Sequence, residues 1–589
     1  MVKTLDAVDA VVVGVGMSGS IIAHELTKAG QKVVGLERGS GRNTVPDFQA
    51  PAMHDELKYS IRKGLMQSAQ KEAVTMRNKS DQTALPIRRW QAFLPGTGLG
   101  GSAVHWNGNI WRFQEADFVL KSHIEKRYGK DFIDPSLSIQ DWGVTYSELE
   151  PYYDRFEKLY GACGKAGNIQ GKIQEGGNPF EAPRSSEYPN KPMKQTYAGA
   201  LFTKAAQSLG YKPFPMPSCT MSQRYTNPLG LTMEACVMCG FCERYGCEHK
   251  AKASPQTTVL PVLLKSELFE LRTQTQVLKV ELDKDGKKAI GVTYVNAAGE
   301  EVFQPAALVV LSMFSLNNVR MMLLSGIGKP YNPVTQEGVV GRNYTYQTIS
   351  GAEVFFDDNV RVNPFMASGS TMMAIDEFSG DNFDHSKLGF IGGAYLYSNI
   401  TNGQPIGFHP VPPGTPRWGQ KFKNAMLKHY NHTVKIGAHG SSMPTPTNYL
   451  DLDPTYKDAW GQPLLRMTFD FSENDLKMSA YITSKLEEIG KAMGGKQVVA
   501  SARKGPFDCN IYQSTHNCGG AVMGDDPSIS AVNTYLQSWD VSNVFVVGAS
   551  AFAHNGSYNP TGTLGALTYR AAEALTSKYL KSPGPLVSL

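Results

Sequence analysis

The N-terminal pattern of hydrophobic positions predicts a strand, a helix and a second strand. The run Ala10–Val13 is short, apolar and β-branched, as expected of a buried parallel strand. A helical pattern follows over Ile21–Ala29, and Gly30 ends it. Gln31–Leu36 then predicts the second strand. This order of elements indicates a parallel α/β unit at the start of the chain.

Later segments continue the α/β pattern. Thr273–Glu300 alternates like three short strands joined by Asp-Gly and Ala-Gly turns. Leu308–Gly328 predicts a strand followed by a helix. Asn543–Val547 predicts another strand, and a helix begins at Thr561, where the preceding Pro560 suits a first helical turn. The sequence shows no internal repeat and no low-complexity tract.

Composition indicates a globular protein with more than one lobe. The chain has 589 residues, of which 41% are hydrophobic and 19% charged, and it is too long for one ordinary core. The net charge of +5 is small and the basic residues are scattered, so nucleic-acid binding is disfavoured. No apolar run reaches the roughly 18 residues of a membrane helix, and the N-terminus has no export signal. We expect a cytoplasmic location unless another subunit carries the chain out.

The first glycine-rich turn predicts a dinucleotide site. Glycines at positions 14, 16 and 19 give the pattern G-x-G-x-x-G between the first strand and the helix. They permit a tight turn, a close approach of backbone to pyrophosphate, and close helix–strand packing, while the acidic residue ending the second strand can accept both ribose hydroxyls. The alternative is a glycine-rich turn of a nucleotide-free protein. The N-terminal position and the following Glu-Arg-Gly are typical of FAD enzymes. The predicted contacts are Gly14, Gly16, Ser18, Gly19, Glu37 and Arg38.

A second glycine-rich segment, Leu94–Phe113, carries a more specific resemblance. Its five glycines indicate backbone pressed against a flat or phosphate-bearing ligand. It resembles the flavin-contacting loop of glucose–methanol–choline (GMC) oxidoreductases. His105–Trp106 also resembles a pyranose oxidase motif whose histidine is bonded covalently to the flavin. Two alternatives stay open for His105: that bond, or packing beside the ring. The family's flavin contacts fall on Gly100, Gly101, Ser102, Asn107 and Gly108.

The GMC resemblance implies further cofactor contacts downstream. The backbone of Val277 would meet the adenine. Ser312–Met313 stands where the family usually has Ala-Gly. Gly548 stands where the family often has Asp, so backbone at Gly548 and Ala549 would supply that contact. The helix N-terminus would direct its dipole at the flavin pyrimidine, with contacts at Asn559, Pro560 and Thr561.

Two C-terminal residues are the predicted catalytic pair. In the family, a histidine of a segment like "THNCGGAVMGDD" is the catalytic base, which places this role on His516. Its partner directly precedes a proline and corresponds to Asn559. Alcohol oxidation needs a group that removes the hydroxyl proton, which histidine can do near neutral pH, while an amide can orient the hydroxyl. The alternatives are a structural role for His516, and His554 as the base.

Four cysteines lie within twelve residues, at Cys236, Cys239, Cys242 and Cys247. The spacing C-x2-C-x2-C-x4-C resembles ferredoxin-like runs more than the separated pairs of structural zinc sites. Disulfides between such near neighbours would be strained. An iron–sulfur cluster is therefore favoured over zinc or redox thiols. All four cysteines are candidate ligands.

A GMC subgroup sharpens the prediction. The flavoprotein subunits of bacterial membrane-bound sugar and sugar-acid dehydrogenases carry a cysteine insert that holds a [3Fe-4S] cluster. The resemblance implies such a cluster here, with [4Fe-4S] as the alternative, and a gluconate-type substrate. It also implies a small subunit with an export signal and a multihaem cytochrome c subunit as partners. Membrane association would come through these partners alone, at the periplasmic face of the inner membrane.

The resemblance implies a GMC-type, Rossmann-like FAD domain intertwined with a substrate domain on an antiparallel sheet. Two other functions stay open: a soluble oxidase that uses O2, with a structural role for the cysteines, and an electron-transfer module reduced by a partner. An anionic substrate would need a cation over the flavin, for which Arg361 and Lys435 are candidates. The predicted division is 1–135 (FAD), 136–214 (connecting), 215–255 (cysteine-rich), 256–350 (FAD), 351–500 (substrate) and 501–589 (FAD and catalytic).

Overall fold

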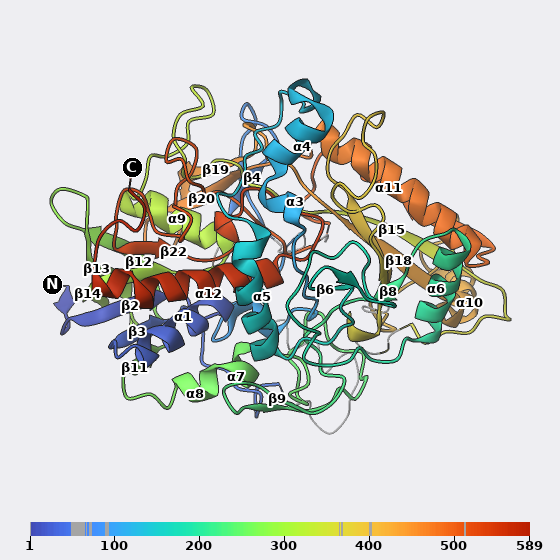
Figure 1. Cartoon of the computed structure of the whole chain (residues 1–589), viewed down its shortest axis with the longest axis horizontal. Coiled ribbons are helices and arrows are strands. Elements are labelled where there is room, and N and C mark those ends of the chain that lie inside the picture. The colour runs from blue at the N-terminus through green and yellow to red at the C-terminus, as the bar shows by residue number, and fades with distance from the viewer. Residues whose placement is uncertain are drawn as a thin grey trace.

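The computed structural model describes residues 2–48, 65, 68–69, 73–88, 93–364, 366, 369–399, 403–511 and 514–588. One large sheet gathers strands from both ends and the middle of the chain (Figure 1). The predicted N-terminal unit is present as β2 (Val8–Val13), α1 (Met17–Lys28) and β3 (Val33–Leu36). β2 lies between β3 and β14 (Glu301–Leu311) and is parallel to both. The other strands are β11 (Phe269–Arg272), β12 (Gln276–Leu282), β13 (Ala289–Val295), β1 (Lys3–Thr4) and β22 (Val544–Val546).

The predicted three-strand meander differs from the structure in one respect. Thr273–Glu300 holds two strands, β12 and β13, and the third strand is the first half of β14. β14 continues without a break into the strand predicted at Leu308. Pro305 normally indicates a strand break, but it pairs with Gly291, where a Cβ would stand only 2.8 Å from the Pro305 Cα. The missing side chain of Gly291 therefore lets the strand continue.

Helices from distant parts of the chain pack beside this sheet. α12 (Thr561–Ser577) begins at the predicted residue and contacts both α1 and α5 (Tyr146–Tyr160). Figure 1 shows the C-terminal α12, in red, beside the blue N-terminal elements. α9 (Ser315–Ser325) follows β14, as predicted, and ends at Gly326 in the left-handed conformation. The two ends of the chain thus meet at one side of the sheet.

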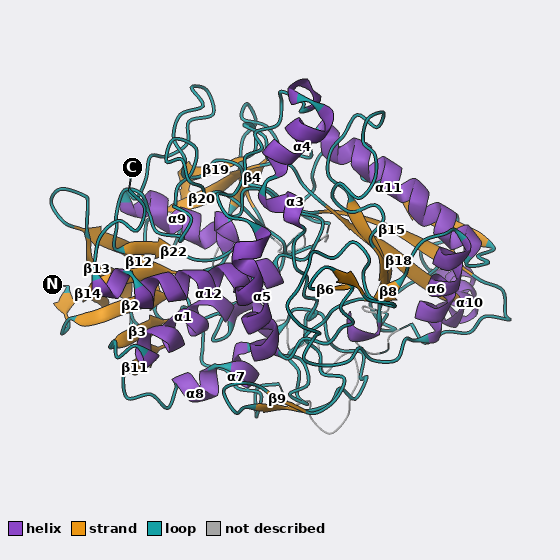
Figure 2. Cartoon of the chain, in the orientation of Figure 1, coloured by secondary structure: helices purple, strands orange, loops and turns teal. Residues whose placement is uncertain are grey.

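A second sheet forms the other half of the molecule (Figure 2). Its strand pairs are antiparallel, and α11 (Glu473–Ala492) contacts three of its strands. α6 (Tyr197–Ser208) contacts two more. In spatial order the strands are β21 (Gln497–Ser501), β15 (Thr348–Phe355), β18 (Thr433–Gly440), β17 (Ala394–Asn399), β16 (Met373–Ile375) and β8 (Phe214–Pro215).

Smaller elements complete the fold. A third sheet contains β19 (Tyr449–Lys457), β20 (Pro463–Thr468), β4 (Thr75–Arg77) and β5 (Leu85–Pro86). Within the described ranges, no helix has both the length and the apolar character needed to span a bilayer. The remaining helices and short strands are α3 (Glu115–Phe118), α4 (Leu120–Tyr128), α7 (Pro255–Thr258), α8 (Leu260–Leu263), α10 (Gly419–His429), β6 (Asn168–Ile169), β7 (Lys172–Ile173), β9 (Tyr225–Thr226) and β10 (Thr232–Met233).

A buried ion-pair network fastens α5 to the loops around it. Glu157, on α5, lies 2.8 Å from the Arg112 Nε and 2.5 Å from the Arg184 Nη2. All three side chains are buried. Burial alone would raise the pKa of Glu157, but the two guanidinium groups outweigh it and hold that pKa below its usual value. The carboxylate is therefore charged and fully paired inside the protein.

Candidate active site

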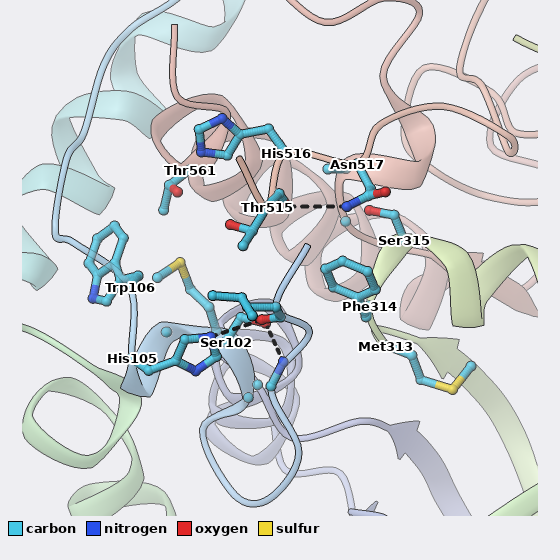
Figure 3. A pocket seen from close by; sticks show the side chains of 18 of the residues that line it. Ser102, His105, Trp106, Met313, Phe314, Ser315, Thr515, His516, Asn517 and Thr561 are labelled. Atoms are coloured by element: carbon cyan, nitrogen blue, oxygen red, sulfur yellow. Dashed lines mark hydrogen bonds between the residues drawn. The ribbon is translucent and has the colours of Figure 1, made fainter. Parts of the chain in front are cut away.

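A cavity of about 690 Å³ is lined by residues of both large sheets and of the loops between them. Figure 3 shows His516 on one side of it, with His105 and Trp106 on the other. Three predicted glycines, Gly19, Gly100 and Gly108, are not part of its wall. The predicted residues that line it are Gly14, Gly16, Ser18, Glu37, Arg38, Gly101, Ser102, His105, Asn107, Val277, His516, Gly548, Ala549, Asn559, Pro560 and Thr561.

The first glycine turn is held against the end of β14. Gly14 has φ +89°, which favours glycine, and a Cβ there would stand 3.0 Å from the Ser312 carbonyl oxygen. The Ser312 hydroxyl donates to the Gly14 carbonyl oxygen at 2.8 Å. A Cβ on Gly19 would lie 2.0 Å from that same oxygen, so Gly19 packs the helix onto the turn. Ser312 therefore ties the end of β14 to the first glycine turn.

Glu37 joins the two glycine-rich loops. Its carboxylate accepts hydrogen bonds from the Val15 N–H at 3.2 Å, the Gly39 N–H at 2.9 Å and the Gly98 N–H at 3.3 Å. The side chain is buried and lines the cavity. Two carboxylate oxygens offer about four acceptor positions. Glu37 therefore has one acceptor position to spare and cannot be assigned to ribose hydroxyls alone.

The second glycine loop leads into a short helical turn and places His105 on the wall. Gly100 and Gly101 have φ +89° and +57°. His105 is buried, and its Nε2 lies 2.9 Å from the Leu94 carbonyl oxygen. Because a carbonyl only accepts, Nε2 carries the proton and Nδ1 is bare; Nδ1 has no hydrogen-bond partner among the described residues. Burial lowers the pKa of His105 to about 4, so the ring is neutral.

The predicted catalytic pair is in direct contact, although its members are far apart in sequence. The Asn559 Nδ2 donates to the His516 Nε2 at 3.2 Å. The Tyr395 hydroxyl donates to the Asn559 Oδ1 at 2.7 Å. Burial, with the nearby His439, lowers the pKa of His516 well below its usual value, so its imidazole is neutral. The competing His554 accepts from the Trp142 Nε1 and does not line the cavity.

Sequence reasoning missed one wall of the cavity. Tyr397, His439 and Ile349 come from β17, β18 and β15, and all three line it. His439 pairs with both Ile349 and Tyr395 across the sheet. Alternation along each strand could have indicated a common face, but not which strands would be neighbours. Lys435 also lines the cavity, 4.2 Å from the Phe408 ring centre.

Of the two candidate cations, only Lys435 is placed on the cavity wall. Arg361 is exposed and does not line it. Lys435 stands four residues from His439 on β18, so the two share a face about 13 Å apart along the strand. It also lies 3.9 Å from Glu353. The expectation for Arg361 is therefore not supported.

The four clustered cysteines surround a second, small cavity of about 20 Å³. The Met238 N–H donates to the Cys236 Sγ, and the Lys252 N–H to the Cys247 Sγ, both at 3.4 Å. Burial raises the pKa of Cys236 to about 12. Within the described part of the chain, no three His, Cys, Asp or Glu side chains are arranged so that they could hold a metal ion. The four thiols are thus neighbours around one small cavity.

The cysteine segment also touches the main cavity. Glu243, Arg244 and Tyr245 line it, directly after Cys242. The Arg244 N–H donates to the His105 carbonyl oxygen at 2.7 Å. The segment is thus in contact with the second glycine loop.

Comparison with known proteins gives the family. Residues 143–349 and 444–568 match GMC oxidoreductase. The gluconate 2-dehydrogenase flavoprotein of Pantoea cypripedii is 51% identical over 589 residues, which cover 99% of this chain and 96% of that protein. The chain belongs to the GMC oxidoreductase family. The fructose dehydrogenase large subunit of Gluconobacter japonicus is 26% identical, and the match covers 97% of this GMC chain and 98% of that subunit. Pyridoxine 4-oxidase from Mesorbium loti shares the GMC fold, with a TM-score of 0.58, 14% identity, and coverage of 96% and 98%.

GMC oxidoreductases bind FAD and act on CH–OH groups, and the cavity fits that cofactor. The α1 N-terminus follows Gly16 and can face a pyrophosphate. A Cβ on Gly16 would have no atom nearer than the Gly101 Cα at 3.9 Å, so backbone borders open space there. The α12 N-terminus and the His516–Asn559 pair border the same cavity. The wall can therefore hold a dinucleotide with the hydrogen-bonded His516–Asn559 pair beside it.

Proposed function

We propose that this protein is an FAD-dependent dehydrogenase that oxidises an alcohol group of a sugar acid of the gluconate type. The observation that carries the proposal is the hydrogen-bonded pair His516–Asn559 on the wall of the FAD-sized cavity. The 51% identity with a gluconate 2-dehydrogenase flavoprotein supports the substrate class. Bound FAD supplies the hydride acceptor.

His516 and Asn559 would manage the proton of the substrate hydroxyl. The substrate hydroxyl would approach the bare His516 Nε2, which takes the O–H proton as the C–H hydride leaves. Asn559 would donate to the substrate oxygen in place of its present bond to Nε2, and so orient the C–H bond. The neutral state of His516 is the one that a base requires. The imidazolium formed would later release its proton to water.

The same proposal includes a covalent flavin at His105. His105 lines the cavity, and its bare Nδ1 has no hydrogen-bond partner among the described residues, so this nitrogen would be the one that forms the bond. The Leu94 carbonyl holds the opposite nitrogen as N–H. This is the tautomer that such a bond needs.

The proposal also includes an electron exit through the cysteine segment. Cys236, Cys239, Cys242 and Cys247 would hold an iron–sulfur cluster, [3Fe-4S] or [4Fe-4S], which would carry electrons singly to a cytochrome c subunit. The donor type and spacing support it, as do the contact between Arg244 and His105 and the exposed Val237 beside Cys236. We further propose that this protein binds a small partner subunit that carries an export signal. The location of the complex would then be periplasmic.

One observation favours a second function. Because no described set of side chains could hold a metal ion, a GMC oxidase with structural cysteines is the alternative. The test is to supply gluconate with either O2 or a one-electron acceptor such as ferricyanide. The proposal predicts rapid acceptor reduction with little peroxide. Rapid peroxide formation, with no bound iron, would support the oxidase.

A further inference from the structure

The side-chain amide of Gln347, just before β15, has a fixed orientation. Gln347 is fully buried. The two N–H groups of its Nε2 are shared among three backbone carbonyl oxygens, those of Gly556 at 3.2 Å, Ser557 at 3.1 Å and Tyr558 at 3.2 Å. Carbonyl oxygens only accept, so the NH2 group must face them. The Oε1 therefore faces the opposite way, toward the His516 Nδ1, with which it is hydrogen-bonded.

This orientation determines the tautomer of His516. The Gln347 Oε1 can only accept, so the proton of the neutral imidazole is on Nδ1. The Nε2 is then bare and accepts from the Asn559 Nδ2. The Asn559 Oδ1 must point away, and it does so, accepting from the Tyr395 hydroxyl. Each bond in the chain Tyr395–Asn559–His516–Gln347 then runs in one direction and agrees with its neighbours.

We propose that Gln347 is the positioning residue that holds His516 as its Nδ1–H tautomer and directs the bare Nε2 toward the substrate hydroxyl. The assignment rests on the proposed function for its consequence in catalysis, but the tautomer itself does not depend on any substrate. A neutral amide, unlike a carboxylate, fixes the proton without adding a charge beside the imidazole. Gln347 does not line the cavity, so it acts through His516.

The tautomer is measured directly by 15N NMR on holoenzyme labelled selectively at histidine, with the His516 signal identified by its loss in His516→Ala. We expect a protonated Nδ1 and a bare Nε2 in the parent protein, and a mixed or reversed pattern in Gln347→Met. A protonated Nε2 in the parent would overturn the assignment. No substrate enters this measurement.

The catalytic consequence is measured by anaerobic rapid mixing with gluconate. In Gln347→Met we expect the limiting rate of flavin reduction to fall on the order of 10²-fold, part of a general base's contribution, with FAD content and the substrate Kd nearly unchanged. Gln140→Met is the matched control: Gln140 is also buried and donates to a backbone carbonyl, that of Met523, and it lies off the cavity wall. Its rate should equal that of the parent.

Gln347→Glu separates positioning from support of the loop. While the new carboxyl holds its proton it offers one O–H to the carbonyls and one C=O to Nδ1, so the rate should approach that of the parent. When this carboxyl ionises, a carboxylate oxygen faces the three carbonyl oxygens and repels them. The rate of flavin reduction in Gln347→Glu should therefore fall with rising pH, whereas the parent rate should not. A parent-like rate and pH profile in Gln347→Met would contradict the role. If gluconate fails to reduce the parent flavin while NMR shows Nδ1–H, the proposed function fails and the tautomer assignment stands.

Discussion

The Lys252 ammonium lies 2.6 Å from the backbone carbonyl oxygen of Trp106, beside the proposed flavin attachment at His105. The same ammonium donates to the carbonyl oxygens of Cys242 at 2.6 Å and Tyr245 at 2.7 Å. Lys252 is almost fully buried, and its three N–H donors match these three acceptors. One side chain therefore joins the second glycine loop to the cysteine segment.

Lys252→Met should loosen this junction. The substitution leaves three carbonyl oxygens without this donor, one of them buried and two partly buried, and we expect the free energy of unfolding to fall by about 1–3 kcal/mol. Chemical denaturation measures the loss. Lys250→Met, two residues away and exposed, should stay within about 0.5 kcal/mol of the parent. Equal stabilities of the two variants would show that the junction contributes nothing.

Glu157→Ala should be among the most destabilising single substitutions. It leaves Arg112 and Arg184 buried without their shared carboxylate, and breaking such a pair costs about 3–5 kcal/mol. Chemical denaturation again gives the value. Glu175, which is exposed, provides the control Glu175→Ala, expected within about 0.5 kcal/mol of the parent. A small effect at Glu157 would mean that Glu150, which pairs with Arg112, and Glu181, which pairs with Arg184, are enough to compensate the two guanidinium groups.

The same carboxylate predicts the pH dependence of stability. The folded-state pKa of Glu157 is lowered, with burial opposing and Arg112 and Arg184 prevailing. The contribution of Glu157 to the free energy of unfolding is therefore complete above its unfolded-state pKa. This contribution is lost as the pH falls through the lower, folded-state pKa. The stability difference between parent and Glu157→Gln should narrow on acidification. A difference that stays constant to low pH would contradict the charged, paired state.

His105→Ala tests the covalent flavin. The parent protein should keep flavin fluorescence on a denaturing gel, and the variant should lose it, because the bare Nδ1 is the proposed attachment atom. His409→Ala removes an exposed histidine and should keep the fluorescence. A parent band without fluorescence would leave His105 as a packing residue.

Iron content tests the cysteine segment. Freshly isolated protein should contain iron and give a low-temperature EPR signal, in the oxidised state for [3Fe-4S] or after reduction for [4Fe-4S]. Cys242→Ser should lower the iron, whereas Cys509→Ser, outside the segment, should not. Iron-free fresh protein would end the cluster proposal and favour the oxidase.

The parts of the fold that local pattern determines were predictable. β2, α1 and β3 follow from one apolar run, one amphipathic stretch and the glycines between them. The continuity of β14 was not predictable, because Pro305 is accommodated by Gly291 on the neighbouring strand. Pairings between distant segments leave no local pattern in the sequence, and these pairings determine the remaining strand order of the sheets.

The candidate site likewise has one part that local motifs predict and another that depends on contacts between distant segments. His516 and Asn559 lie in segments with a recognisable motif, and the structure brings them into contact. Tyr397 and His439 reach the cavity through the pairing of β17 with β18. Gln347 carries no motif at all, since its role depends on carbonyl groups more than two hundred residues away. Side chains that act through such contacts are visible only in the folded protein.

The role of His516 as the base of a sugar-acid dehydrogenase can be measured by anaerobic rapid mixing of the parent protein and His516→Ala with gluconate. We expect gluconate to bleach the parent flavin. We expect the variant to keep its FAD but to be reduced more slowly, on the order of 10²- to 10⁴-fold. Near-equal rates of flavin reduction in the two proteins would contradict this role.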